Sequence, residues 1–281
     1  VEIYIMSSRL ELKLSACMLY VYSNLTLGNA KASERGLEII RECLRKEMEA
    51  PTSERNTAYC VFAGYMGTVL LHLSTEELPD MKKYMSSLPQ GLRIFAAYVI
   101  SHNLYLKGEY SRALGICDAA LFSCKEIYPV GMIYLHCVTA MCEISLKNPA
   151  EAEKAILTAW KLAVKDELIE PFIELHGLLQ GLLESCIRKE NPEMYRKISD
   201  AVITFSRGWM AVHNPASDRP VTDALTTMEF SIAMLACRDW SNREIAEHMG
   251  VSLNTVKHYL TDIFNKLHVK KRDELKNFVL K

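Results

Sequence analysis

The sequence predicts an all-α protein, in which helical hairpins stack as an α-solenoid and a small unit of four helices follows. Three observations lead to this fold class. Glycine and proline, which interrupt helices, number only 12 and 9 in 281 residues. Apolar residues make up 49% of the chain, enough to bury a large core. The third observation is an approximate repeat of helical pairs that ends near residue 212.

The clearest helical pair lies in residues 104–121, LYLKGEYSRALGICDAAL. Gly108 lets the chain turn there, and Ala113 lets the two helices approach closely because its side chain is small. A related pair is expected in residues 144–163, where Ala152 stands 39 residues after Ala113. Further pairs are expected in residues 27–44, which contain Gly36, in residues 57–88 with a break near Ser74, and in residues 170–213 with a break near Asn191 and Pro192.

A repeat of about 39 residues, each a pair of helices, is typical of an α-solenoid. It resembles tetratricopeptide repeats, in the longer form found in large bacterial transcription activators. The alternative is an irregular helical bundle. The concave surface of a solenoid would be the sensor or partner site. Candidate ligand-facing residues are Tyr59, Tyr65, His102, Tyr105 and Tyr134, although aromatic residues at helical spacing are more often part of a core.

The helical pattern stops at residues 213–225, HNPASDRPVTDAL. Two prolines, an asparagine and two aspartates in this stretch are typical of a linker. The sequence therefore predicts a helical repeat domain over residues 1–212, a linker over residues 213–224 and a second domain over residues 225–281.

The second domain contains start and stop signals for four short helices. Thr226 and Ser241 are each followed three residues later by glutamate, which predicts a capping box at the start of a helix. Gly250 is placed to end the second helix, and Ser252 to cap the third. A fourth helix is expected in residues 270–281, KKRDELKNFVLK. Two helices joined by a turn of about three residues describe a helix-turn-helix.

The third helix of this domain is expected to have one apolar face and one polar face. Its apolar residues Val256, Leu260, Ile263 and Leu267 are predicted to pack against Leu235, Ile245 and Ala246. Side chains on a polar face of this kind read base edges in the major groove, and a basic cluster after it would hold phosphates. The alternative is a polar face that is only solvated. The candidate DNA-binding residues are Ser252, Asn254, Thr255, Lys257, His258, Thr261, Asn265, Lys266, Lys270, Lys271 and Arg272.

Residues 225–275 resemble the LuxR-type helix-turn-helix domain. The resemblance rests on LT..E at the start, SNREIA at 241–246, GVS..TVK at 250–257 and I..KL.V..R at 263–272. It implies DNA binding through the third helix, with Lys257, His258 and Thr261 facing bases or phosphates. The family usually has histidine where Tyr259 stands and a basic residue where Thr261 stands, so the base preference is open.

Family members commonly pair through the last helix, which implies a homodimer on DNA. Leu275, Phe278 and Val279 are the candidate dimer contacts. The alternative is that these three side chains close the core of the domain.

Other classes of function find less support in the sequence. The nine cysteines are odd in number and contain no CxxC pair, so we expect reduced thiols and a cytoplasmic location. His136, Cys137 and Cys142 lack the spacing of a metal site, and no long apolar run or signal segment appears. Without a catalytic motif or a phosphate-binding loop, we expect no enzymatic activity and no cofactor in this chain.

The sequence thus predicts a bacterial transcription regulator. Its expected partners are double-stranded promoter DNA, a second copy of the chain on DNA, and a small-molecule or protein effector at the repeats, with RNA polymerase as a further candidate. A nucleotide-binding module would precede Val1 if the protein resembles large ATP-dependent (MalT-like) activators throughout. The rival hypothesis is a protein-interaction scaffold whose helix-turn-helix contacts protein rather than DNA.

Overall fold

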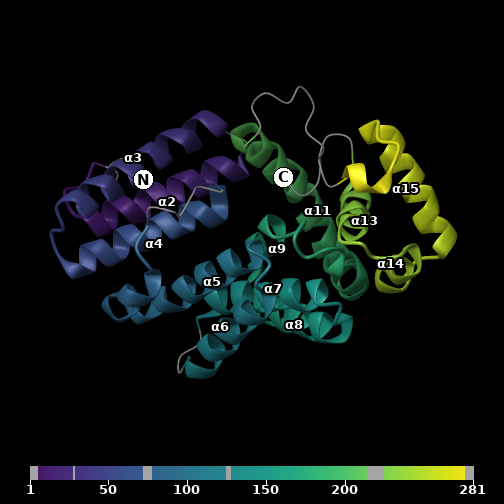
Figure 1. Cartoon of the computed structure of the whole chain (residues 1–281), viewed down its shortest axis with the longest axis horizontal. Coiled ribbons are helices and arrows are strands. Elements are labelled where there is room, and N and C mark those ends of the chain that lie inside the picture. Colours follow the sequence, from purple (N-terminus) through teal and green to yellow (C-terminus); the bar gives the residue numbers. More distant parts are fainter. Residues whose placement is uncertain (1–5, 28, 72–77, 125–127, 214–224, 276–281) are drawn as a thin grey trace. The chain divides into compact units, whose positions relative to one another are not determined.

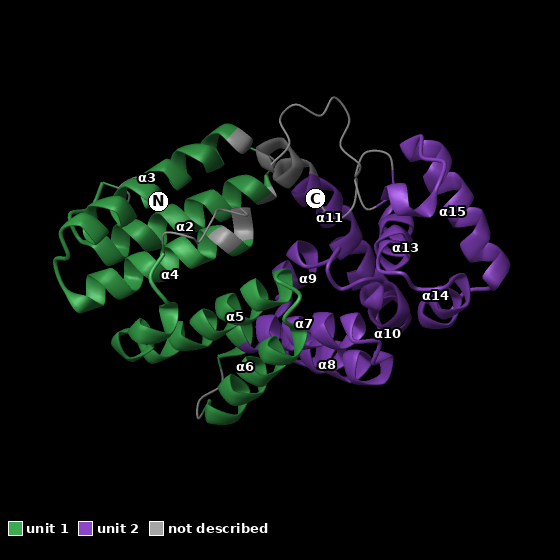
Figure 2. Ribbon diagram, in the orientation of Figure 1, with its two compact units in different colours: residues 1–131, 208–215 green, residues 132–207, 216–281 purple. Residues whose placement is uncertain are grey.

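The predicted all-α fold is confirmed by the computed structural model (Figure 1). The structure describes residues 6–27, 29–71, 78–124, 128–213 and 225–275, and no strand occurs in these ranges. The chain forms two compact units (Figure 2). Unit 1 comprises residues 1–131 and 208–215, and unit 2 comprises residues 132–207 and 216–281.

Unit 1 is built from helices that pack against their neighbours in the chain, α2 on α3, α3 on α4 and α5 on α6. Helices α2 and α3 approach closely at Gly36 on α3, where an added β-carbon would lie 2.6 Å from Cγ2 of Val21 on α2. Gly36 therefore allows these two helices to pack closely. The elements of this unit are α2 (Leu10–Thr26), α3 (Ala30–Glu49), α4 (Glu54–Leu71), η1 (Met81–Ser87), α5 (Gln90–Leu106) and α6 (Tyr110–Ser123).

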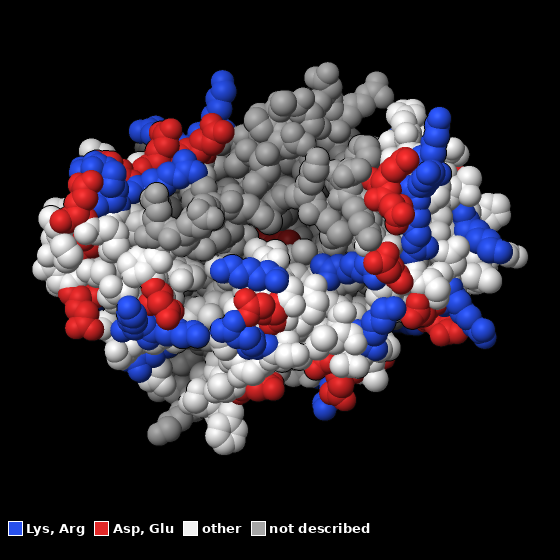
Figure 3. All heavy atoms as spheres, viewed as in Figure 1, with Lys and Arg blue, Asp and Glu red and all other residues white. Residues whose placement is uncertain are grey.

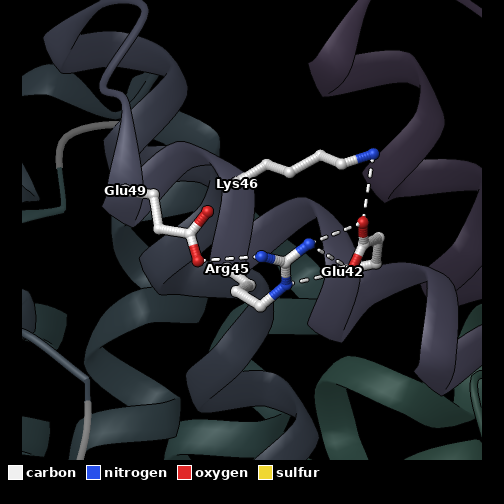
Figure 4. Close-up of polar contacts among 4 residues, drawn as sticks. All are labelled: Glu42, Arg45, Lys46 and Glu49. Atoms are coloured by element: carbon white, nitrogen blue, oxygen red, sulfur yellow. Dashed lines mark hydrogen bonds and ion pairs between the residues drawn. The ribbon is translucent and has the colours of Figure 1, made fainter.

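Helix α3 carries a row of ion pairs along its solvent face (Figure 4). The Arg45 guanidinium lies 3.0 Å from Glu42 Oε1 and 2.8 Å from Glu49 Oε1, and Lys46 Nζ lies 3.1 Å from Glu42 Oε1. Hydrogen bonds from Lys46 and Arg45 lower the pKa of Glu42. These spacings of three and four residues are those at which helix side chains meet, so the row supports the C-terminal part of α3.

One expected pair in unit 1 differs from the structure. The pair predicted in residues 57–88 begins with α4, but its second arm is only the short 3-10 helix η1. Pro79 and Pro89 flank η1 on either side, and each removes a backbone donor, so this stretch is too short for a second α-helix. The break expected at Ser74 lies outside the described residues.

Unit 2 contains most of α7 and α11 together with the C-terminal helices. Two pairs of neighbours dominate its C-terminal part: α13 with α15, and α14 with α15. Its elements are α7 (Pro129–Ser145), α8 (Pro149–Ala163), η2 (Val164–Asp166), α9 (Glu170–Glu174), the π-helix η3 (Leu183–Ile187), α10 (Arg188–Glu190), α11 (Pro192–His213), α13 (Thr227–Cys237), α14 (Asn242–Met249), α15 (Leu253–Leu267) and η4 (Arg272–Leu275).

Two hairpin turns repeat the same backbone geometry at the predicted spacing of 39 residues. Gly108, between α5 and α6, has a φ of 76°, and Lys147, between α7 and α8, has a φ of 62°. The N–H of Glu109 donates to Leu104 O at 2.9 Å, and the N–H of Asn148 donates to Glu143 O at 2.9 Å. The pairs predicted in residues 104–121 and 144–163 are therefore present. Whether the whole array is tetratricopeptide-like stays a prediction.

The pair expected in residues 170–213 has an irregular first arm. Helix α9 ends at Glu174, and the chain then turns through Gln180 and Gly181, whose φ values are 49° and 85°. It continues as a π-helix and a short α10 rather than as one α-helix. The predicted break is confirmed, because α11 begins at Pro192.

The aromatic residues considered as ligand-facing belong mainly to the core. Tyr59, His102, Tyr105 and Tyr134 are buried, and Tyr65 is half-buried. His102 Nδ1 lies 3.2 Å from the Tyr98 hydroxyl, and the Tyr134 hydroxyl donates to Glu174 Oε2 at 2.7 Å. The thiols of Cys17 and Cys60 also belong to the core, and burial raises the pKa of Cys17 to about 11 and of Cys60 to about 12.

Most of the linker predicted over residues 213–224 lies outside the described residues. The division of the chain into two units falls elsewhere, at residue 131, because α14 packs against η3 of the preceding helical segment. The predicted domain boundaries therefore stay a prediction about the sequence, while the compact unit that holds α13–α15 also includes α8–α10.

We expect Gly36→Leu to destabilise the protein by about 2 kcal/mol, because the side chain would overpack the contact with Val21. Gly115→Leu on α6 is the matched control, since no atom lies within 4 Å of its added β-carbon. That change should raise the free energy of unfolding by about 0.5–1 kcal/mol, because glycine disfavours a helix interior. Urea unfolding measures both. Equal effects of the two changes would contradict the close approach at Gly36.

Candidate nucleic-acid interface

The start and stop signals read from the sequence are present in the three helices of the C-terminal domain. Thr226 and Ser241 each form a complete capping box, with Glu229 and Glu244 respectively. Gly250 ends α14 in the left-handed conformation, with a φ of 63°. The Ser252 hydroxyl accepts the N–H of Thr255 at 3.1 Å and caps α15. Local sequence thus sets the bounds of α13, α14 and α15.

The apolar stripe of α15 is buried as predicted. Val256 and Ile263 have no exposed surface, and Leu260 and Leu267 are 6% and 7% exposed. Leu235 on α13 and Ile245 and Ala246 on α14 are buried too, and α15 contacts both helices. Burial of this stripe fixes the rotation of α15 about its axis, so its opposite face is directed to solvent.

The polar face of α15 is accessible to a ligand. Ser252, Asn254, Lys257, His258, Thr261 and Asn265 are all exposed, and Thr255 is half-buried. The Thr261 hydroxyl donates to Lys257 O at 3.0 Å, so its oxygen can still accept a hydrogen bond from a ligand. The face therefore offers one ammonium, one imidazole, two carboxamides and hydroxyl groups, which are the groups that bind base edges.

The basic cluster after this face is divided into two kinds of residue. Lys270 and Lys271 are exposed, as a phosphate contact requires. Lys266 Nζ instead lies 2.7 Å from both carboxylate oxygens of Glu229. Arg272 donates to Ala236 O at 3.1 Å, to Asn242 Oδ1 at 2.9 Å and to Trp240 O. Lys266 and Arg272 therefore join helices within the domain.

Glu229 is the residue whose role the sequence analysis missed. Its side chain is 6% exposed and takes part in both the capping box and the ion pair with Lys266. Burial works to raise the pKa of this carboxyl group, but Lys266 and the donors of Thr226 outweigh burial, so the pKa is lowered. The sequence did predict Glu229 as the capping residue of a helix that the apolar core would surround. A buried carboxylate at such a position needs a cation beside it, and this could have indicated a lysine or arginine partner.

The candidate dimer contacts are only partly described. Leu275 in η4 has no exposed surface, which agrees with the alternative that it closes the core of the domain. Phe278 and Val279 lie outside the described residues, as does most of the predicted fourth helix.

The electrostatic character of the surface is mixed. Figure 3 shows basic and acidic side chains interspersed on the face drawn there, including the part formed by α13–α15. Among the described residues, no three His, Cys, Asp or Glu side chains are grouped as metal ligands. The described helices also include none with the length and apolar character needed to cross a bilayer. The exposed cations of α15 are therefore a local feature rather than part of a strongly basic protein.

We expect Glu229→Gln to remove part of the pH dependence of stability. A lowered carboxyl pKa stabilises the fold above the usual value of 4.5, and this stabilisation is lost as the pH falls through the folded pKa. The variant should lose about 1–3 kcal/mol at about pH 7 and approach the wild type at about pH 3. Urea unfolding at both pH values checks this, with Glu247→Gln on the exposed side of α14 as the control. A constant difference at both pH values would contradict the ion pair.

Comparisons with known proteins agree with this geometry. Residues 223–279 match the family model described as bacterial regulatory proteins, luxR family. The chain is also 28% identical over 94 residues to the probable transcriptional regulatory protein SgaR of Hyphomicrobium methylovorum. That alignment covers 30% of this chain and 40% of SgaR, so the chain spans well under two thirds of the relative it matches. No solved structure matches the chain. The C-terminal part of this chain is a helix-turn-helix domain of the luxR family.

Proposed function

We propose that this protein is a DNA-binding transcriptional regulator in which α15 reads the major groove of promoter DNA. The observation that carries the proposal is the exposed polar face of α15, held outward by the buried stripe behind it. A recognition helix of a helix-turn-helix enters the major groove with its N-terminal residues against base edges. Asn254 and Lys257 occupy the first two turns of α15 and are the proposed base contacts, with His258 and Thr261 beside them.

The exposed lysines in the turn after α15 supply the proposed phosphate contacts. Lys270 and Lys271 hold the duplex against the domain, and the Ser252 cap places backbone N–H groups at the start of α15. Lys266 and Arg272 contribute indirectly, because they fix α15 and η4 on α13. Double-stranded DNA is thus the partner of this surface.

The helical segments before the domain are proposed to receive the signal. A small-molecule or protein effector binds there, and RNA polymerase is a further candidate partner. On DNA the chain acts as a homodimer, so the two half-sites of the promoter lie about 10 bp apart or a multiple of this distance. The protein works in the cytoplasm and needs no cofactor. The matched luxR-family domain and the regulatory name of SgaR support regulation rather than catalysis.

We expect Lys257→Glu to weaken binding to the promoter by at least tenfold, because a carboxylate would face base edges and phosphates. Lys161→Glu makes the same charge change at an exposed position near the end of α8 and should leave binding unchanged. Circular dichroism confirms that both variants fold, and gel shifts measure their affinity. Unchanged affinity of Lys257→Glu would favour the rival hypothesis, a protein-interaction scaffold that contacts no DNA.

The affinity of the wild type should fall steeply with salt, since each lysine–phosphate contact releases a condensed counterion. The three to four contacts of this surface in each of the two chains of the homodimer should contribute about −6 to the slope of the plot of log K against log salt concentration. Fluorescence anisotropy with a labelled duplex at graded salt measures this slope. A slope near zero would show that phosphates do not contribute and would contradict the proposed surface.

A further inference from the structure

The face of the domain formed by α13 and α14, away from the polar face of α15, is packed on residues 175–189 of the same unit, which we call the seat. Two seat glycines leave room for large side chains: a β-carbon on Gly177 would lie 2.6 Å from Phe230 Cε1, and one on Gly181 would lie 2.3 Å from Met249 Sδ. His248 donates from Nε2 to Gln180 O at 3.0 Å. Burial lowers the pKa of this imidazole, which favours its neutral form.

This packing places two lysines of the helical segment at the two ends of α14. Lys147 Nζ lies 3.4 Å from Glu244 Oε1 and 6.0 Å from the centre of the Trp240 ring, beside the first turn of α14. Lys189 Nζ lies 3.2 Å from the point where a β-carbon on Gly250 would stand, at the turn between α14 and α15. Both side chains are exposed.

In a helix-turn-helix, the helix before the recognition helix crosses the DNA backbone. In this domain that helix is α14. We propose that Lys147 and Lys189 contact DNA phosphates, so that the DNA-binding surface extends beyond the matched residues 223–279 onto the helical segment. The inference rests on the proposed function and adds a phosphate-binding surface to it.

The backbone at Lys147 supports a role for its side chain. Its φ of 62° lies in the left-handed region, where glycine is favoured, and Gly108 occupies the equivalent place in the hairpin 39 residues earlier. A lysine held in this conformation must be supported by its surroundings, and such residues occur preferentially at functional sites. Backbone hydrogen bonds hold this turn, from the Lys147 N–H to Ile144 O at 3.1 Å and from the Asn148 N–H to Glu143 O at 2.9 Å, and the Lys147 side chain lies beside Glu244 and Trp240.

Electrostatics at the start of α14 give a second reason. Glu244 completes the capping box, so a carboxylate stands where the first turn would meet a phosphate. Hydrogen bonds from the Ser241 backbone and side chain, and then Lys147, lower its pKa, which keeps the carboxylate charged. The ammonium of Lys147 offsets that charge, and a DNA strand passing α14 would otherwise be repelled there.

The test compares Lys147→Gly and Lys189→Gln, singly and together, with the wild-type full chain on one labelled promoter duplex at graded salt. Each single substitution removes one phosphate contact from both chains of the homodimer, so it should make the slope of log K against log salt less steep by about 1.8, and the double variant by about 3.6. Glycine suits the backbone at position 147, so the variant should fold. The weakening should be equal on promoter and random duplexes, because phosphate contacts carry no sequence information.

The controls are Lys107→Gln, in the equivalent turn of the other hairpin, and Lys161→Gln on α8, and both should keep the wild-type slope.

Thermal unfolding of every variant separates the proposal from a purely structural role, in which the two lysines only hold α14 on the seat. In that alternative the melting temperature falls and the slope stays that of the wild type, which would overturn the inference. If Lys257→Glu weakens binding while the double variant keeps the wild-type slope, only this inference fails and the proposed function stands.

Discussion

The burial of four side chains along one stripe of α15 is the constraint on which the candidate site depends. Val256, Leu260, Ile263 and Leu267 are driven out of water against α13 and α14. A helix has one rotation that buries such a stripe, so Asn254, Lys257 and His258 on the opposite side face solvent. The buried stripe thus fixes the direction of the polar face of α15, and the polar groups on that face remain available to a ligand.

The charges of the domain are divided between cohesion and recognition. Glu229 is buried beside the start of α13, and a buried carboxylate is costly unless a cation lies beside it. Lys266 meets that need, and Arg272 joins Ala236, Trp240 and Asn242 across three segments. Exposure does not separate the two groups, because Lys266 is exposed like Lys257, Lys270 and Lys271, and what distinguishes it is its pairing with Glu229. A count of basic residues in the sequence does not separate these two groups.

The packing of α13 and α14 on the seat connects the domain to the helical segment before it. Glycines at positions 177 and 181 remove the side chains that would clash with Phe230 and Met249, and the left-handed turn at Gly181 brings the backbone close to α14. Within the seat, His176 Nε2 and Glu184 Oε1 form a buried pair 2.8 Å apart. Burial would raise the pKa of Glu184, but His176 outweighs it and the pKa is lowered. The seat thus packs directly against α14, the helix that leads into α15.

The sequence by itself determined the features that depend on near neighbours: the helical class, the capping boxes at Thr226 and Ser241, the stop at Gly250, the two hairpins with equivalent turns, and the apolar stripe of α15. Each follows from spacing within one or two helical turns. Tertiary structure decided what depends on residues far apart in the chain. It paired Lys266 with Glu229, buried Leu275, broke the helix expected over residues 170–190 and joined the terminal domain to the seat. Local pattern could not predict these, because burial and the nearest opposite charge are set by which segments meet in space.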